Sequence, residues 1–176
     1  GRFERAKGVE TLIKAFINIA KVYKNIRLIN VGESRGPSKE RCIKWLNAAG
    51  LIDRVTFTGF VHYKDLPQHY GNADIVVVPS EIYESFSYTV AQAMACGKPV
   101  VASNIGGISE TLDNGNAGLL FEPGNIDELF TNIELLYSDI SARESYGQKA
   151  REYSVRKFSF QALGTSYNKF YRSILL

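Results

Sequence analysis

The sequence has few of the residues that build metal centres or disulfide scaffolds. It contains only two cysteines and two histidines among 176 residues. Cys42 and Cys96 lack the short spacing of metal-ligand pairs, so we expect both to be reduced thiols in a cytoplasmic protein. No DxD-like acidic pair is present either. The sequence therefore predicts neither a resident metal nor a redox role.

Long hydrophobic runs and concentrated basic runs are also absent. The longest apolar stretches, such as residues 75–79, are far too short to cross a bilayer. The formal net charge of +3 is small, and we expect it to be spread out, which argues only weakly for a polyanionic partner. No basic stretch alternates with aromatic residues as in single-strand binding platforms, so we expect no nucleic acid partner.

The chain has the size and composition of one soluble domain. Of its 176 residues, 45% are hydrophobic and 22% are charged, which suits a core covered on both faces. The first residues lead directly into a charged segment and show no export signal. Because the chain begins with Gly1 rather than Met, we expect residues 1–176 to form a single domain taken from a longer protein.

The hydrophobic pattern switches repeatedly between the periods of helices and strands. Helical spacing covers residues 8–24, 38–50, 65–72, 86–97, 106–113, 126–138, 141–155 and 159–175. Strand-like apolar runs cover residues 26–32, 54–59, 74–80, 99–103 and 117–121. Strands that lack polar alternation and are separated by helices are typical of parallel βαβ units. We predict an α/β fold, a doubly wound Rossmann-like parallel sheet of about six strands with helices on both faces and extra C-terminal helices.

In such sheets ligands bind beyond the carboxyl ends of the strands, where the βα loops converge. The first of these loops, residues 1–8, supplies Arg2 and Lys7 as candidate phosphate-binding cations, with Gly8 opening the next helix. Arginine can grip phosphate oxygens as a planar fork, lysine acts as a mobile charge, and a helix start offers free N–H groups. The alternative is that both cations are simply solvated. No GxxxxGK[ST] loop occurs, which excludes a Walker-type site.

The loop before residues 86–97 is richer in polar groups. Glu84 stands before an expected helix whose first turn carries Ser85 and Ser87. Backbone N–H groups there can face an anion, and a carboxylate beside them can accept hydrogen bonds from sugar hydroxyls. The alternative is that Ser85 only caps the helix while Glu84 favours its dipole.

Gln92 is a lone amide in an otherwise apolar helical segment. It follows Glu84 by eight residues, and its neighbours from Val90 to Ala95 are apolar and small. A buried amide that lacks hydrogen-bond partners costs about 1–3 kcal/mol for each failure. Gln92 therefore faces either solvent or a loop, or it faces a polar ligand.

Seven segments occur in an order that resembles a known enzyme family. They are GRFERAKG, VGES, VTFTGFV, ADIVVVPS, ESFSYTVAQAMACGKPVVAS, GGISE and GNAGLLFEPGN. Together they resemble the C-terminal, nucleotide-sugar-binding half of retaining glycosyltransferases with the two-domain GT-B architecture, glycosyltransferase family 4. The resemblance covers nearly the whole chain.

The resemblance implies roles for several loop residues. Arg2 and Lys7 match the family's arginine and lysine that hold the donor diphosphate. Glu84 matches the first glutamate of its E-x7-E pattern, which contacts the transferred sugar. Val61 and His62 would lie along the nucleotide base through backbone contacts. We expect Glu84, Arg2 and Lys7 to carry the catalytic roles, and no metal to be needed.

The sequence departs from the family pattern at two places. The turn Glu84-Ser85-Phe86-Ser87 matches the family's E-G-F-G, whose backbone amides meet sugar and phosphate, but serines replace both glycines. Gln92 falls on the second glutamate of E-x7-E, which binds the ribose hydroxyls. Gln92 keeps one acceptor oxygen and loses the charge, and we expect it to face the ribose.

The resemblance implies a glycosyltransferase donor domain that binds a UDP- or GDP-linked hexose for retaining transfer. The acceptor would be held by an absent N-terminal domain, and the isolated chain would bind donor weakly and transfer nothing. Any peripheral membrane association, at the inner membrane surface, would run through that absent half. Two alternatives stay open, namely a degenerate non-catalytic binding or assembly module and a GT-B nucleotide-sugar epimerase.

Overall fold

A computed structural model describes residues 4–33 and 37–175 of the chain. Its helices are α1 (Val9–Val22), α2 (Pro37–Ala48), α3 (Leu66–Gly71), α4 (Tyr88–Ala95), α5 (Gly107–Thr111), α6 (Ile126–Ser138), α7 (Ile140–Phe158) and α8 (Phe160–Leu175). Its strands are β1 (Leu28–Asn30), β2 (Val55–Phe57), β3 (Val76–Val78), β4 (Val100–Ser103) and β5 (Leu119–Phe121). Short 3-10 turns add η1 (Arg5–Lys7), η2 (Ile52–Arg54) and η3 (Asp113–Gly115). The predicted alternation of strands and helices is confirmed.

The strands form two parallel sheets rather than one. β1 pairs with β2, and β4 lies between β3 and β5. The prediction of one sheet of about six strands is therefore wrong in its detail, because the described residues contain five strands in two ladders. Each strand keeps only three or four paired residues, so the apolar runs of the sequence extend beyond the hydrogen-bonded ladders of the structure.

Helices cover both faces of the three-stranded sheet. In β4, Val101 points into a core formed with α1, α2 and α6. Its neighbours Val100 and Ala102 point the other way, into a second core formed with α4, α5 and α7. Successive residues of a strand face opposite sides of the sheet, and all three side chains are fully buried. The prediction that both faces are covered, which followed from strands without polar alternation, is confirmed.

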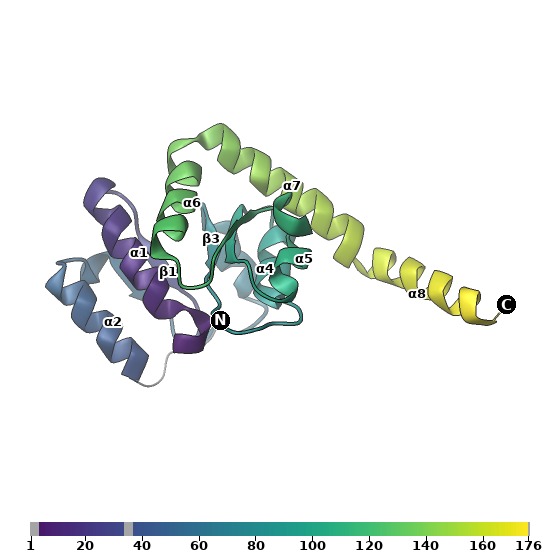
Figure 1. Ribbon diagram of the computed structural model, residues 1–176, viewed down its shortest axis with the longest axis horizontal. Coiled ribbons are helices and arrows are strands. Elements are labelled where there is room, and N and C mark those ends of the chain that lie inside the picture. The colour runs from purple at the N-terminus through teal and green to yellow at the C-terminus, as the bar shows by residue number, and fades with distance from the viewer. Residues whose placement is uncertain (1–3, 34–36, 176) are drawn as a thin grey trace.

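The C-terminal helices differ in how they pack. α7 packs against α4 and α6, whereas α8 extends away from the body of the molecule (Figure 1) and has no buried side chain. Its apolar side chains are exposed, among them Phe160, Tyr167 and Ile174. No helix in the described ranges is long and apolar enough to cross a membrane. Both cysteines are free thiols, and burial raises the pKa of Cys42 to about 11.

Candidate functional site

Two of the predicted site residues meet at the carboxyl ends of the strands. Lys7 ends η1, directly before α1, and Glu84 lies in the loop between β3 and α4. The Lys7 Nζ donates a hydrogen bond to Glu84 Oε1 at 2.8 Å. The two side chains are 27% and 16% exposed, so the pair is accessible to a ligand but only partly screened by water. The fold brings these residues together across 77 positions of sequence.

A glycine allows the start of α1 to lie against the end of β3. Gly8 has a φ of +68°, and a Cβ added to it would lie 1.6 Å from the carbonyl oxygen of Pro79. Only glycine fits such a close approach with that backbone conformation. Two further contacts fix the same junction: the Glu81 N–H donates to the Ala6 carbonyl at 2.9 Å, and the Thr11 hydroxyl donates to the Glu81 carboxylate at 2.5 Å.

A second glycine places the turn that carries Glu84. The Gly107 N–H, at the start of α5, donates to the Glu84 carbonyl at 2.7 Å. A Cβ on Gly107 would lie 2.0 Å from the Ser85 carbonyl oxygen. The loop before α5 and the loop before α4 therefore pack backbone against backbone, which fixes the direction in which the Glu84 side chain leaves the turn.

The surroundings of Glu84 keep its side chain ionised. Burial by itself raises the pKa of Glu84, but the hydrogen bond from Lys7 and the hydroxyls of Ser80 and Ser87 lower it, as does the Lys7 charge. The net result is a pKa below the ordinary value for a glutamate. Glu84 is therefore a carboxylate at neutral pH, able to accept hydrogen bonds from hydroxyl groups.

A cavity of about 130 Å³ lies beside this pair. Its lining comes from the loop at the start of α1, the ends of β1 and β3 and the start of α4, and includes Lys7, Asn30, Ser80, Glu84, Ser87 and Thr89. One cation, one carboxylate and several neutral polar groups thus converge on one small space. Such a set can bind an anion and a polyol side by side.

Asn30 is a lining residue that sequence reasoning missed. It ends β1, and its side-chain amide nitrogen is buried without a hydrogen-bond partner in the described residues. A buried amide without a partner is uncommon in folded proteins and costs about 1–3 kcal/mol. The signal available in the sequence was a single asparagine inside the apolar run Leu28 to Val31.

The start of α4 differs from the prediction. The helix begins at Tyr88 rather than at residue 86, because Ser87 has the extended backbone of an N-cap, with φ −102° and ψ 101°. Ser85 and Ser87 therefore precede the helix instead of lying in its first turn. The N-cap is Ser87, so the alternative that Ser85 caps the helix is wrong. The Ser87 side chain is buried and gives no capping hydrogen bond, which leaves the first N–H groups of α4 without a side-chain cap.

Other predicted donor-binding residues lie farther from the cavity. Phe86 stacks edge-on against Phe158 and Tyr88, with ring centroids 5.5 and 5.2 Å away. Val61 is half-buried and His62 exposed in the loop after β2, and neither lines the cavity. Arg2 lies outside the described residues.

Gln92 does not lie in a buried environment. It is exposed, as is Ala95 one turn later, so α4 is only partly covered. The Tyr70 hydroxyl of α3 donates to Gln92 Oε1 at 3.2 Å, and Gln92 is absent from the lining of the cavity beside Lys7. Burial raises the pKa of Tyr70 to about 12, so this hydroxyl stays protonated. Of the two alternatives for Gln92, an orientation toward solvent or a neighbouring loop agrees with its exposure and its contact with Tyr70, and its contact with a ligand stays a prediction.

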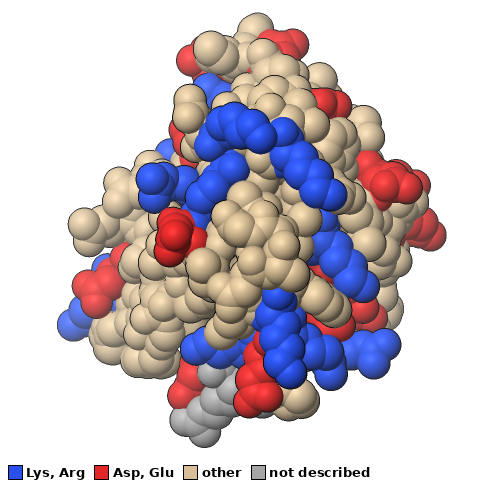
Figure 2. Space-filling view, turned by 90° about the vertical axis from the view of Figure 1, so that its left-hand side faces the viewer, with Lys and Arg blue, Asp and Glu red and all other residues tan. Residues whose placement is uncertain are grey.

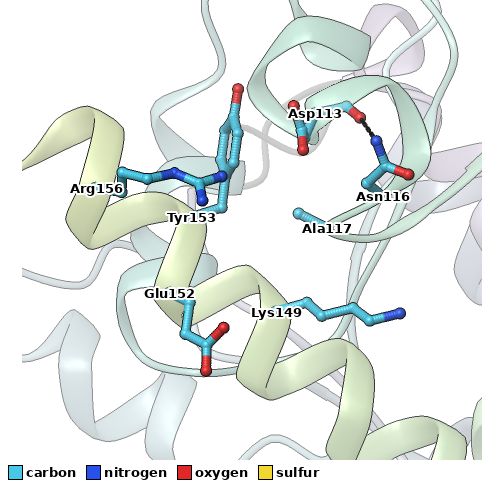
Figure 3. A pocket seen from close by; sticks show the side chains of 7 residues that line it. All are labelled: Asp113, Asn116, Ala117, Lys149, Glu152, Tyr153 and Arg156. Carbon is cyan, nitrogen blue, oxygen red and sulfur yellow. Dashed lines mark hydrogen bonds between the residues drawn. The ribbon is translucent and has the colours of Figure 1, made fainter.

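A larger cavity of about 220 Å³ lies elsewhere, between η3 and α7 (Figure 3). It is lined by Asp113, Asn116, Ala117, Lys149, Glu152, Tyr153 and Arg156. Some of its groups contact one another: the Arg156 guanidinium lies 5.4 Å from the Tyr153 ring centroid, and the Asn116 amide donates to the Asp113 carbonyl at 3.0 Å. Burial together with the neighbouring Asp113 raises the pKa of Tyr153. None of the predicted site residues that the structure describes lines this cavity. Within residues 4–33 and 37–175, no cluster of three or more His, Cys, Asp or Glu side chains could hold a metal ion.

Comparison with known proteins places this geometry in a family. Residues 1–153 match the family described as "Glycosyl transferases group 1". The chain is 29% identical to an alpha-D-kanosaminyltransferase of Streptomyces kanamyceticus, over 99% of this chain and 44% of the relative. It is 34% identical to a D-inositol 3-phosphate glycosyltransferase of Paenarthrobacter aurescens, over 85% of this chain and 37% of the relative. The chain thus spans less than half the length of these relatives.

Solved structures agree with the sequence matches. HepE of Anabaena, crystallised with UDP, superimposes with a TM-score of 0.87 at 28% identity, over 98% of this chain and 47% of HepE. The C-terminal domain of a glycosyl transferase group 1 protein from Francisella tularensis gives a TM-score of 0.83 at 27% identity, over 91% of this chain and 84% of that domain. Each likeness covers almost the whole chain. By the family match over residues 1–153, the chain belongs to the glycosyl transferases group 1 family.

Proposed function

We propose that this chain is the donor-binding half of a retaining glycosyltransferase. The observation that carries the proposal is the Lys7–Glu84 contact of 2.8 Å at a cavity in front of the uncapped start of α4. A nucleotide-sugar donor needs a positive site for its diphosphate and an acceptor site for its sugar hydroxyls, and this arrangement offers both within one cavity. In this proposal the two sheets together serve as the floor of a doubly wound, Rossmann-like fold.

The proposed chemistry is electrostatic. Transfer with retention develops negative charge on the leaving diphosphate while the sugar becomes oxocarbenium-like. Lys7 and the first N–H groups of α4 stabilise that charge, and Arg2 supplies a second cation. Glu84 accepts hydrogen bonds from the sugar and orients it. In the ligand-free protein Lys7 and Glu84 neutralise each other, so a bound diphosphate draws Lys7 away and frees Glu84 for the sugar.

The turn before α4 and the loop after β2 complete the proposed donor site. The backbone N–H groups of Ser85, Phe86 and Ser87 face the sugar and the phosphates. The backbone of Val61 and His62 lies along the nucleotide base.

We further propose that Gln92 contacts the ribose with its amide nitrogen. Its oxygen already accepts a hydrogen bond from Tyr70, which fixes the orientation of the side chain and leaves the nitrogen free to donate. A glutamine held in this way offers the ribose its N–H donors in place of the charged acceptor that the resembling family carries. We expect weaker nucleotide binding than a carboxylate would give.

The complete reaction requires a second half. The chain spans 37% and 44% of two full-length relatives, and the apolar face of α8 is exposed. We propose that an N-terminal domain holds the acceptor and covers the open side of the cavity. The 176 residues alone then bind donor weakly and transfer no sugar. The free thiols of Cys42 and Cys96 support a cytoplasmic location.

A calorimetric screen of UDP, GDP, ADP and their sugars tests the proposal. We expect binding of a UDP-linked donor, because HepE was crystallised with UDP and with UDP-glucose. Binding of GDP alone would retain the function and change the base. If none of the nucleotides binds, the donor-site proposal fails and a non-catalytic module, marked by Gln92 and by serines at 85 and 87, is favoured instead.

A further inference from the structure

The charge of this protein is concentrated in one part of the chain. Residues 1–54 contain 12 Lys and Arg against 5 Asp and Glu, a net charge of +7, whereas residues 55–176 contain 9 against 13, a net charge of −4. The expectation that the charge is spread out is therefore wrong. The basic part contains α1, β1 and α2, on the left in Figure 1.

The two basic helices form one continuous surface. Their first turns touch, because Ser38 of α2 donates to Glu10 of α1 at 3.1 Å, and farther along Lys14 of α1 lies 4.9 Å from the ring centroid of Trp45 in α2. From the first contact to the second, the residue numbers increase along both helices, so α1 and α2 lie parallel and side by side. Figure 2 shows Lys and Arg side chains gathered in a band across this side of the molecule.

Four exposed lysines lie on this surface. We call Lys14, Lys21, Lys24 and Lys44 the basic face. Between residues that the structure describes, none of the four forms an ion pair. Two neighbouring arginines are committed elsewhere: Arg41 pairs with Glu10, and Arg54 donates to the backbone carbonyls of Ala20, Tyr23 and Ile26.

We propose that the basic face is a docking surface for a membrane that contains anionic phospholipids, which departs from the expectation that membrane association runs through the absent half. Lysines near such a surface are drawn to its diffuse negative potential without needing a fixed geometry. Val22, 58% exposed between Lys21 and Lys24, is an apolar group that can enter the headgroup region. The Trp45 ring is half-buried beneath Lys14, so it offers no open stacking platform of the kind that single-stranded nucleic acids use.

The basic face is separate from the proposed donor site. Lys7 precedes α1, whereas Lys21 and Lys24 lie at its far end. Fourteen residues of helix span about 21 Å at 1.5 Å per residue, and none of the four lysines lines the cavity beside Lys7. Docking through this face therefore leaves the cavity open, and it does not depend on whether the chain binds a nucleotide.

Co-sedimentation with vesicles tests the docking proposal. The 176-residue chain is mixed with vesicles of phosphatidylcholine alone or of phosphatidylcholine with phosphatidylglycerol, at low and at high salt. We expect tighter binding to the anionic vesicles, and loss of that difference at high salt because exposed charges are screened. Each lysine near the surface contributes about fivefold to binding, from about 1 kcal/mol per residue. The variant Lys21→Glu/Lys24→Glu/Lys44→Glu should therefore lose at least about 100-fold.

A matched control removes the same charge from a different surface. The variant Lys157→Glu/Lys169→Glu/Arg172→Glu changes three exposed cations in α7 and α8 and should retain the preference for anionic vesicles. Equal losses of vesicle binding in the two variants would overturn the proposal in favour of the overall charge. Loss of binding only in the control would overturn it in favour of α8. Heparin binding that matches vesicle binding in strength, and is unchanged in Val22→Ser, would overturn it in favour of a soluble polyanion. Circular dichroism verifies that each variant is folded.

Discussion

The close approach of α1 to the end of β3 makes Gly8→Ala the most informative single change for the architecture of the site. Gly8 combines a left-handed φ of +68° with a Cβ position only 1.6 Å from the Pro79 carbonyl oxygen. An added methyl group cannot occupy that position, so the start of α1 has to move away from β3. The movement displaces Lys7 on one side of the substitution and the buried Val9 on the other.

The expected loss has two parts. The left-handed backbone costs an L-residue roughly 1–2 kcal/mol. Partial exposure of Val9 costs about a further 1.5–2 kcal/mol, since that is the order of the transfer energy of a buried valine side chain. The sum is about 2.5–4 kcal/mol, which for a chain of this length lowers Tm by roughly 5–16 °C.

Gly50→Ala separates the two parts. Gly50 has nearly the same φ, +66°, but nothing lies within 4 Å of its Cβ position. It should therefore lose only the backbone cost of roughly 1–2 kcal/mol. Urea denaturation of both variants gives the two free energies of unfolding. If Gly8→Ala is destabilised no more than Gly50→Ala, the close packing of α1 against Pro79 is not what positions Lys7.

Three further predictions concern the cavity. Asn30→Ala should be slightly stabilising or neutral in the free protein, since it removes a buried amide without a partner, yet calorimetry should show weaker nucleotide-sugar binding; an unchanged affinity would show that Asn30 does not touch the ligand. The pKa of Glu84 is lower in the folded protein than in the unfolded chain. Its contribution to stability is therefore present above the unfolded pKa and is lost as the pH falls through the folded pKa. Glu84→Gln should flatten the dependence of the free energy of unfolding on pH in that range, and superimposable curves would contradict this. Gln92→Ala should weaken nucleotide binding and Gln92→Glu should strengthen it by adding a charged acceptor for the ribose, whereas equal affinities of all three proteins would place Gln92 outside the site.

The fold could be predicted from the sequence because its apolar spacing is regular. The helix predicted over residues 8–24 is α1, Val9–Val22, since an amphipathic pattern repeats over several turns and errors at the ends are small. Strand lengths are harder to predict from the sequence. The apolar run 26–32 predicts a strand of seven residues, whereas the paired strand contains only Leu28–Asn30. Apolar character reports burial, whereas the ladder depends on a neighbouring strand that the run itself does not reveal.

The candidate site could be predicted only in part. Lys7 and Glu84 were identified from their loops and from the resemblance, and the structure brings them into contact. The choice between the two alternatives for Gln92 could not be made from the sequence, because small alanines such as Ala95 fit equally well in a core and on a surface. Asn30 was missed because a polar residue at the end of a buried strand carries no periodic signal, and its lack of a partner is visible only in three dimensions.

The measurement that tests the central claim most directly is donor affinity with and without the Lys7 charge. Calorimetry measures the affinity of three proteins, the wild-type chain, Lys7→Met and Lys21→Met, for the nucleotide diphosphate that binds best. The two variants compare a cation at the cavity with an exposed cation at the far end of α1. A charge-assisted contact to phosphate contributes about 1.5–3 kcal/mol, so Lys7→Met should lose at least about tenfold in affinity while Lys21→Met matches the wild type. Equal affinities of the three proteins would contradict the assignment of the Lys7–Glu84 cavity as the donor site.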